Sequence, residues 1–384
     1  MSPIVPSTRA ELAAAHRLVV KVGSSSLTDD AGHLDPDKLT ALVDQLAAHR
    51  ARGHEVVLVS SGAQAAGMGP LGLTRKPKDL AQAQAAASVG QGLLMAHYTR
   101  AFAAHGLQVG QVLLTAEDVV RRSHYRNALR VLGELLHSGI VPVVNENDAV
   151  ATDEIRFGDN DRLAALVAHL VRADGLVLLT DVDGLYTAPP SRPGARRIEE
   201  VTSFDDLAPV EVTGRGSAVG TGGMVTKVQA AAMASTSGIP VLLTDAATVG
   251  QALTGAPVGT FFHVTGRRVP ARRMWLGYAA QMKGHLVVDD GAVRAITSGK
   301  KSLLAVGVVG FAGEFGVGEP VEIRSLAGRV VARGLSGFTS AELAQVKGLS
   351  EDQIAAVLGA DRAVPAVHRD ELVTQAGSRR PEAA

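Results

Sequence analysis

Short apolar runs rich in Val, Leu and Ile alternate with segments of helical periodicity through the first two thirds of the chain. The runs cover residues 18–22, 56–59, 109–114, 140–144, 176–179 and 239–243. The helical segments lie between them, at 36–52, 80–104, 126–137 and 162–173. Repeated strand–helix–strand units predict an α/β fold, a mostly parallel sheet sandwiched by helices. Because ligands of such sheets bind beyond the carboxyl ends of the strands, the residues that follow each run are the candidates for function.

Capping residues support the predicted ends of the helix at 36–52, and two glycines argue against a continuous helix at 80–104. Asp35 and Pro36 supply an N-cap and a first-turn proline for the helix at 36–52, and Gly53 fits its end. Gly90 and Gly92 are expected to interrupt the Ala/Gln-rich segment at 80–104.

Composition narrows the class of protein. The 384 residues suffice for two or three domains. The formal net charge of zero gives no excess of positive charge for binding nucleic acid or an anionic membrane. No cysteine is present, so disulfides and thiol chemistry are excluded. The N-terminus lacks the apolar segment of a signal peptide and no run is long enough to span a bilayer, so we expect a soluble cytoplasmic protein.

The character of the chain changes near residue 265. Residues 1–265 carry the α/β pattern, and 266–282 read as an arginine-containing linker. Residues 283–366 contain β-like runs at 285–288, 302–309, 320–323 and 329–334 and a late helix at 350–358, which predict a small mixed β domain. The tail at 367–384 is expected to be disordered.

An unusual concentration of carboxylates and amides follows the run at 140–144. Its candidates to bind a small polar molecule that carries an ammonium group are Asn145, Asn147, Asp148, Asp159, Asn160 and Asp161. The alternative is a solvated turn, since Asn and Asp often bond their own backbone in loops.

Two glycine-containing turns, each with a lysine, could bind phosphate. Lys21 closes the first strand just before Gly23 and Ser24, and its alternative role is that of an edge lysine reaching solvent. The second turn precedes a helix candidate and comprises Gly220, Thr221, Gly222, Gly223, Met224, Val225, Thr226 and Lys227. Glycines allow the backbone to approach an anion, and a helix N-terminus adds a positive dipole. The turn could equally be a flexible cap, and the chain contains no Walker A sequence and no G-x-G-x-x-G after its first strand.

Two further strand ends carry hydroxyl and carboxylate groups. Thr180 and Asp181 could contact a nucleotide, and Ser61 follows the second strand, although an ordinary turn explains each nearly as well. The histidines show no metal-ligand spacing. Two lysines, two glycine turns and an acidic loop at one sheet edge fit phosphoryl transfer, which requires positioning and positive charge rather than a nucleophilic side chain.

Six motifs resemble the amino acid kinase family and, within it, the glutamate 5-kinases. They are V-V-K-V-G-S-S-S-L-T (19–28), V-S-S-G-A (59–63), V-N-E-N-D-A-V-A-T (144–152), F-G-D-N-D (157–161), L-L-T-D (178–181) and G-T-G-G-M-V-T-K (220–227). The resemblance extends to residues 283–366, which are similar to a PUA domain. The family's first turn often has Thr where this chain has Ser24, which retains the hydroxyl.

The resemblance implies an enzyme that uses ATP to phosphorylate the side-chain carboxylate of L-glutamate, the first step of proline biosynthesis. By the same resemblance, Lys21 and Lys227 stabilise the transferring phosphoryl group and Asp161 orients both lysines. Ser61, Asp148 and Asn160, with Asn145 and Asp159, hold glutamate. Lys21, Gly23, Ser24, Thr180, Asp181 and the 221–227 turn (Thr221, Gly222, Gly223, Met224, Val225, Thr226 and Lys227) contact ATP, whose oxygens and water bind Mg²⁺. Inhibition by proline and a homo-oligomer are further implications.

Two alternatives stay open. Another amino acid kinase could act on aspartate, acetylglutamate, carbamate or a nucleotide. PUA-like domains often bind RNA, but residues 283–366 contain nine Lys and Arg against nine Asp and Glu, so the basic face of an RNA-binding protein is not evident. Arg294, Lys300 and Lys301 are the one local cluster that could form such a face.

Overall fold

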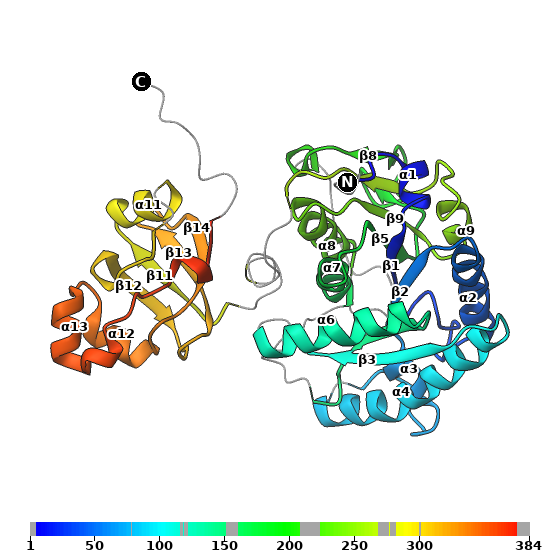
Figure 1. The fold of residues 1–384 in the computed structure, drawn as a ribbon, viewed down its shortest axis with the longest axis horizontal. Coiled ribbons are helices and arrows are strands. Elements are labelled where there is room, and N and C mark those ends of the chain that lie inside the picture. Colours follow the sequence, from blue (N-terminus) through cyan, green and yellow to red (C-terminus); the bar gives the residue numbers. More distant parts are fainter. Residues whose placement is uncertain are drawn as a thin grey trace. The chain divides into compact units, whose positions relative to one another are not determined.

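The structure is a computed structural model that describes residues 5–77, 79–115, 118, 122–150, 160–207, 223–267, 276, 282–298 and 301–374. The chain divides into two compact units, residues 1–271 and 272–384. Each unit has a hydrophobic core of its own. We describe the units separately (Figure 1).

Strands and helices alternate through the N-terminal unit. Its helices are α1 (Arg9–Ala13), α2 (Pro36–Ala51), α3 (Ala63–Met68), α4 (Leu80–Ala103), α6 (Arg122–His137), α7 (Asn160–Leu170), α8 (Met224–Thr236) and α9 (Val249–Ala252), with a 3-10 turn η1 (Phe204–Leu207). Its strands are β1 (Arg17–Val22), β2 (Glu55–Ser60), β3 (Val109–Leu114), β4 (Val141–Glu146), β5 (Gly175–Thr180), β6 (Leu185–Tyr186), β7 (Arg197–Ile198), β8 (Glu200–Val201), β9 (Val241–Asp245) and β10 (Thr260–Phe262).

Eight of these strands form one sheet, in the order β3-β4-β2-β1-β5-β9-β10-β8. The first six run parallel, as the alternating pattern predicts. Strand β10 then runs antiparallel to β9 and pairs with β8. Helices α7 and α8 lie on one side of the central strands, and α2 and α9 lie on the other (Figure 1). The predicted α/β architecture is confirmed.

Burial explains why the central strands read as apolar runs. Nearly every residue of β1, β2, β4 and β5 is buried, because helices cover both faces of the sheet. Lys21 is the one buried residue of β1 with an ionisable side chain, and it is only 4% exposed. A lysine in this position is costly unless it is paired, and its partner defines the site described below.

Helix α2 begins and ends as its sequence predicts. The side chain of Asp35 accepts hydrogen bonds from the backbone N–H groups of Asp37 and Lys38, and Pro36 occupies the first turn. Gly53 follows the helix with φ of 89°, a conformation that glycine adopts without strain.

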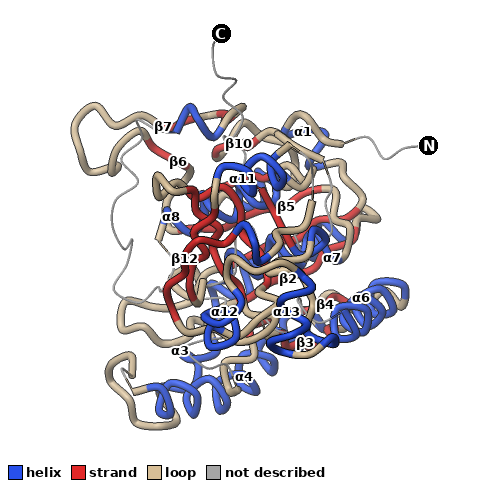
Figure 2. Tube along the Cα trace, turned by 90° about the vertical axis from the view of Figure 1, so that its left-hand side faces the viewer, coloured by secondary structure: helices blue, strands red, loops and turns tan. Residues whose placement is uncertain are grey.

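Helix α4 is continuous, so the predicted interruption at Gly90 and Gly92 is wrong. Gly90 instead allows α4 to approach α3: a Cβ at Gly90 would lie 1.8 Å from the carbonyl oxygen of Ala63. Gly67 of α3 shows the reciprocal requirement, since its Cβ would lie 1.9 Å from the carbonyl oxygen of Ala86. The two helices lie side by side in both views (Figures 1 and 2).

The C-terminal unit is a mixed β structure with short helices. Its elements are β11 (Gly284–Val288), α11 (Asp290–Thr297), η3 (Ala305–Gly307), β12 (Val308–Gly313), β13 (Pro320–Ser325), β14 (Val330–Leu335), α12 (Ser340–Val346), α13 (Glu351–Leu358), η4 (Ala360–Arg362), η5 (Arg369–Glu371) and β15 (Leu372–Thr374). The sheet order is β12-β11-β13-β14-β15.

Four features of this unit differ from the sequence predictions. Helix α11 was not predicted. The strand expected at 302–309 is displaced, because a 3-10 turn occupies Ala305–Gly307 and the strand follows it at Val308–Gly313. Helix α12 was not predicted, although its capping box of Thr339 and Glu342 is visible in the sequence. Strand β15 pairs with β14, so the sheet extends past residue 366, where the disordered tail was expected to begin. Leu372 explains this extension, since it packs into the core of the unit.

Among the described residues, no helix combines the length and apolar character needed to cross a membrane.

Candidate active site

Polar residues from separate strands meet at the carboxyl edge of the parallel sheet. Val22, which follows Lys21 in β1, lies opposite Ser60 at the end of β2. Val144 pairs with Val59, so Asn145 lies level with Ser60 on the neighbouring strand β4. The strand register thus brings together the ends of β1, β2 and β4, three of the predicted functional segments.

A buried carboxylate joins the two lysines singled out in the sequence. Asp161 Oδ1 lies 2.6 Å from Lys21 Nζ, and Asp161 Oδ2 lies 3.1 Å from Lys227 Nζ. The three side chains are 5%, 0% and 8% exposed for Lys21, Asp161 and Lys227. Asp161 comes from the first turn of α7 and Lys227 from the first turns of α8, so two packed helices and a strand build the group.

The electrostatics of Asp161 follow from this geometry. Burial alone would raise the pKa of its carboxyl, but the ammonium groups of Lys21 and Lys227 outweigh burial, and the pKa lies below its ordinary value. The hydroxyl of Thr226 also donates to Asp161 Oδ2, at 3.0 Å. Asp161 is therefore ionised at neutral pH, and the formal charges of the three side chains sum to +1.

The first glycine turn lies beside the Lys21 ammonium group. A Cβ at Gly23 would lie 3.6 Å from Lys21 Nζ, which is an ordinary van der Waals distance, so the turn is in direct reach of that nitrogen. The carbonyl oxygen of Ser24 accepts the backbone N–H of Leu27 at 2.9 Å, which closes the turn.

The second glycine turn is described only from Gly223 onward. Gly223 is the N-cap of α8 and provides no side-chain hydrogen bond to its first turn. Met224 and Val225 begin the helix. The single hydroxyl proton of Thr226 is shared between Asp161 Oδ2 and the carbonyl oxygen of Gly223, which lies 2.8 Å from Thr226 Oγ1. Within the described ranges, no side chain caps the N-terminus of α8 that precedes Lys227, and such a terminus is suited to bind an anion. Thr221 and Gly222 lie outside the described residues.

An amide cluster adjoins the charged group through Asn160, the residue before Asp161. Asn160 Nδ2 donates to Ser61 Oγ at 2.9 Å and to Asn145 Oδ1 at 2.9 Å. Asn145 Nδ2 in turn donates to Gln91 Oε1 at 2.9 Å. Asn145 belongs to β4 and Asn160 to α7, so the predicted polar loop supplies two residues to regular structure. Asp159 lies outside the described residues.

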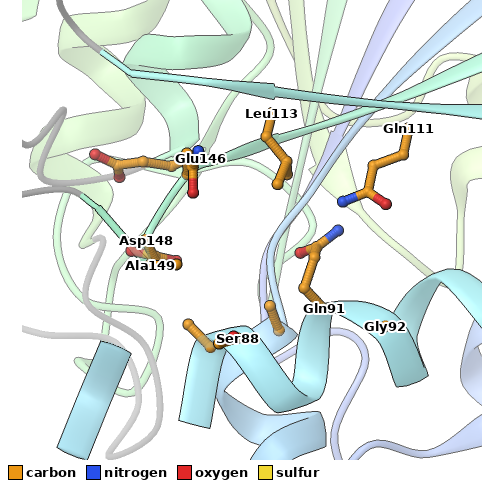
Figure 3. Close-up of a pocket in the computed structure, with 11 residues that line it drawn as sticks. Ser88, Gln91, Gly92, Gln111, Leu113, Glu146, Asp148 and Ala149 are labelled. Atoms are coloured by element: carbon orange, nitrogen blue, oxygen red, sulfur yellow. The ribbon is translucent and has the colours of Figure 1, made fainter. Parts of the chain in front are cut away.

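A pocket of about 270 Å³ lies next to the amide cluster (Figure 3). Its lining combines polar side chains from α4 and β4 with apolar ones, and comprises Ala63, Ala87, Ser88, Gln91, Gly92, Gln111, Leu113, Glu146, Asn147, Asp148 and Ala149. Asn147 and Asp148 are the residues predicted from sequence. Ser88 and Gln91 are not, since nothing in the Ala/Gln-rich pattern of α4 distinguishes a pocket residue from any other helical residue. Glu146, at the end of β4, is also a pocket residue that was not predicted.

Thr180 and Asp181 lie at the same edge of the sheet, at the end of β5. Leu178 pairs with Lys21, so Thr180 lies two residues further along the neighbouring strand. Thr180 is buried, and its hydroxyl donates to Asp181 Oδ1 at 3.0 Å. The pair is thus positioned at the edge that carries the charged group.

Comparison with known proteins agrees with the fold described above. Residues 16–245 match the amino acid kinase family, and residues 284–358 match the PUA domain. The carbamate kinase of Giardia lamblia, solved bound to AMP-PNP, shares the fold with a TM-score of 0.50 at 17% identity, over 65% of this chain and 99% of that chain.

The chain belongs to the amino acid kinase family. Within that family it groups with the glutamate 5-kinases. It is 59% identical to the glutamate 5-kinase of Streptomyces coelicolor, over 94% of this chain and 96% of that protein. It is 56% identical to that of Bifidobacterium longum, over 97% of this chain and 99% of that protein. It is 55% identical to that of Thermobifida fusca, over 96% of both chains.

Proposed function

We propose that this protein transfers the terminal phosphoryl group of ATP to the side-chain carboxylate of L-glutamate, giving L-glutamyl 5-phosphate for proline biosynthesis. The glutamate 5-kinases that it matches over nearly their full length support this reaction. The observation that carries the proposal is the buried group formed by Lys21, Asp161 and Lys227.

That group has the charge that phosphoryl transfer requires. Two ammonium groups share one carboxylate, so a net positive charge is buried where an anion can neutralise it. During transfer, negative charge develops on the phosphoryl oxygens, and preorganised cations stabilise it more strongly in a water-poor site than in water. Asp161 holds both lysines in position, since each of its oxygens faces a different ammonium nitrogen.

The nucleotide would bind beside these lysines. The turn at Gly23 and Ser24 and the N-terminus of α8, which begins at Met224, would offer backbone N–H groups to phosphate oxygens. Thr180 and Asp181 would contact the nucleotide from the neighbouring strand. Thr221 and Gly222, which precede Gly223 in the sequence, are proposed to contact ATP as well.

Glutamate would bind in the pocket and the adjoining amide cluster. Asp148 lines the pocket and supplies a carboxylate for the α-ammonium group. Asn160 contacts both Asn145 and Ser61. From there Ser61 and Asn160 can bind the α-carboxylate and α-ammonium groups of glutamate. Asp159 is proposed to complete this side of the site.

Mg²⁺ is proposed to enter with ATP. Within the part of the chain that the structure describes, no group of three or more Asp, Glu, His or Cys side chains is arranged to hold a metal ion. A hard cation would therefore be bound mainly by phosphate oxygens and water, and would neutralise part of their charge. Proline inhibition, a homo-oligomer and a cytoplasmic location are further proposals, and they rest on the family resemblance of the sequence alone.

The test is a coupled assay of the purified chain with ATP, Mg²⁺ and L-glutamate. ADP release measures turnover, and hydroxylamine trapping shows whether an acyl phosphate forms. We expect both signals with glutamate and much weaker ones with aspartate, N-acetylglutamate or carbamate. ADP release without a trapped acyl group, or a preference for another acceptor, would overturn the proposal. A parallel series with proline tests the inhibition.

A further inference from the structure

A chain of side-chain amides links helix α4 to the hydroxyl of Ser61. Gln91 accepts a hydrogen bond from Asn145, Asn145 accepts one from Asn160, and Asn160 donates a second one to Ser61. Gln91 has no part in the roles assigned above, but it lies both in this chain and in the pocket wall.

One backbone N–H group determines the orientation of all three side-chain amides, those of Gln91, Asn145 and Asn160. The N–H of Glu146 donates to Asn145 Oδ1 at 2.9 Å, and a backbone N–H cannot act as an acceptor. Asn145 must therefore present its oxygen to Glu146 and Asn160 and its nitrogen to Gln91. It follows that Gln91 presents Oε1 to Asn145 and that Asn160 presents Nδ2.

This orientation sets the polarity of the groups that would meet the substrate. Ser61 Oγ accepts from Asn160 Nδ2, so the hydroxyl proton of Ser61 is left to donate to an anionic group. Asn160 Oδ1 is buried without a hydrogen-bond partner among the described residues, and it is suited to accept from an ammonium group. A donor and an acceptor side by side match the α-carboxylate and α-ammonium groups of an amino acid.

Gln91 stabilises the end of the chain opposite Ser61. Asn145 is 2% exposed, so without Gln91 Oε1 its Nδ2 would be a buried donor with no partner, and the side chain would rotate to recover one. Figure 3 shows Gln91 rising from the helix into the pocket that Glu146 and Asp148 line on the other side. Its own Nε2 is buried and has no partner within the described ranges, as is usual for a group completed by a ligand or an ordered water.

We propose that Gln91 is a positioning residue for the acceptor: through Asn145 it orients Asn160 and Ser61 to recognise the zwitterionic end of the amino acid. This inference rests on the proposed function, because it assigns the acceptor to this side of the site.

The experiment compares Gln91→Met and Gln91→Glu with wild type in the full chain. Methionine keeps the length of the side chain, but its thioether sulfur is only a weak acceptor for the Asn145 hydrogen bond. We expect the glutamate KM to rise by about tenfold or more, while kcat and the ATP KM change less than about twofold. The Gln91→Glu variant retains an acceptor oxygen and should recover most of the glutamate affinity. Gln82→Met, at an exposed position of the same helix, is the matched control and should behave as wild type.

Acceptor selectivity separates positioning from general destabilisation. Glutarate lacks the α-ammonium group, so the preference for glutamate over glutarate should narrow in Gln91→Met and persist in Gln91→Glu. An unchanged glutamate KM in Gln91→Met would overturn the role of Gln91 but not the proposed function. So would an unchanged preference for glutamate over glutarate together with equal losses of affinity for ATP and glutamate. A wild-type chain inactive on glutamate would instead refute the proposed function, and this inference with it.

Discussion

Lys227 and Asp161 form an ion pair of 3.1 Å in the interior of the N-terminal unit, where both side chains are less than a tenth exposed. Such a pair is expensive to build, because both ions lose their hydration. The second ammonium group, that of Lys21, adds to that cost rather than reducing it, since it leaves a net positive charge. A fold that only needed stability would gain more from apolar residues at these positions. The arrangement is therefore best explained by an anionic ligand.

Replacing Asp161 by Asn should destabilise the protein and also impair turnover. The change leaves Lys21 and Lys227 buried without their shared carboxylate, a loss of about 3–5 kcal/mol in the free energy of unfolding. Urea denaturation at pH 7 measures this loss. Saturating ATP should restore more stability to the variant than to wild type, because phosphate oxygens then supply the missing negative charge. Equal stability of variant and wild type without nucleotide would contradict the role of Asp161.

Replacing Asp148 by Ala should raise the glutamate KM by at least about tenfold, since a hydrogen-bonded charge partner of the ammonium group is lost. The ATP KM should change little, because Asp148 lines the pocket rather than the lysine group. Asp30→Ala, at an exposed position, serves as the control. An unaltered glutamate KM in the Asp148 variant would remove this residue from the acceptor site.

His49 should make the protein less stable in mild acid. Burial, together with the neighbouring His54 and Arg52, lowers the pKa of His49 to about 4 from 6.5. Between these values the unfolded chain takes up a proton that the folded protein excludes. Stability is therefore full above about pH 6.5 and falls as the pH is lowered toward 4, by up to about 1.4 kcal/mol per pH unit.

The check is the free energy of unfolding of wild type and His49→Gln at pH 7, 6 and 5. Glutamine does not titrate, so the difference between the two proteins should shrink as the pH falls. His33→Gln, at an exposed position, should retain the pH dependence of wild type. Parallel pH profiles for wild type and His49→Gln would show that His49 is not the group responsible.

A chain that ends at residue 282 should keep the chemistry. None of the proposed site residues lies in the C-terminal unit, and the N-terminal unit has its own core. We expect its kcat to stay within about tenfold of that of the full chain. Removing one group that stabilises the transition state would lower kcat by more than this. A folded but inactive truncation, by circular dichroism and the coupled assay, would mean that residues 283–384 contribute to the site or to its assembly.

The sequence predicts the sheet well because its strands are buried on both faces and therefore read as uninterrupted apolar runs. It predicts the end of β4 less well, since Asn145 and Glu146 are polar yet buried, and polarity marks a loop only when the residue is exposed. It is wrong about Gly90, which does not interrupt α4. A glycine is needed there because α3 packs closely against it, and the sequence does not reveal that contact. It identifies Asn160 but not Gln91, because the hydrogen-bond chain between them exists only after α4, β4 and α7 have packed.

The central claim is that Lys21 and Lys227 act on the same phosphoryl group, and a double-mutant cycle of kcat tests it most directly. Lys21→Met, Lys227→Met and the double variant are assayed by hydroxamate formation from glutamate, with Lys38→Met, at an exposed position, as the control. Each single change should lower kcat by at least about 100-fold with a nearly unchanged glutamate KM, because the charges matter most in the transition state. The double variant should lose far less than the product of the two single losses, as groups that act together do. Single variants with near wild-type kcat, or losses that multiply fully, would contradict the account.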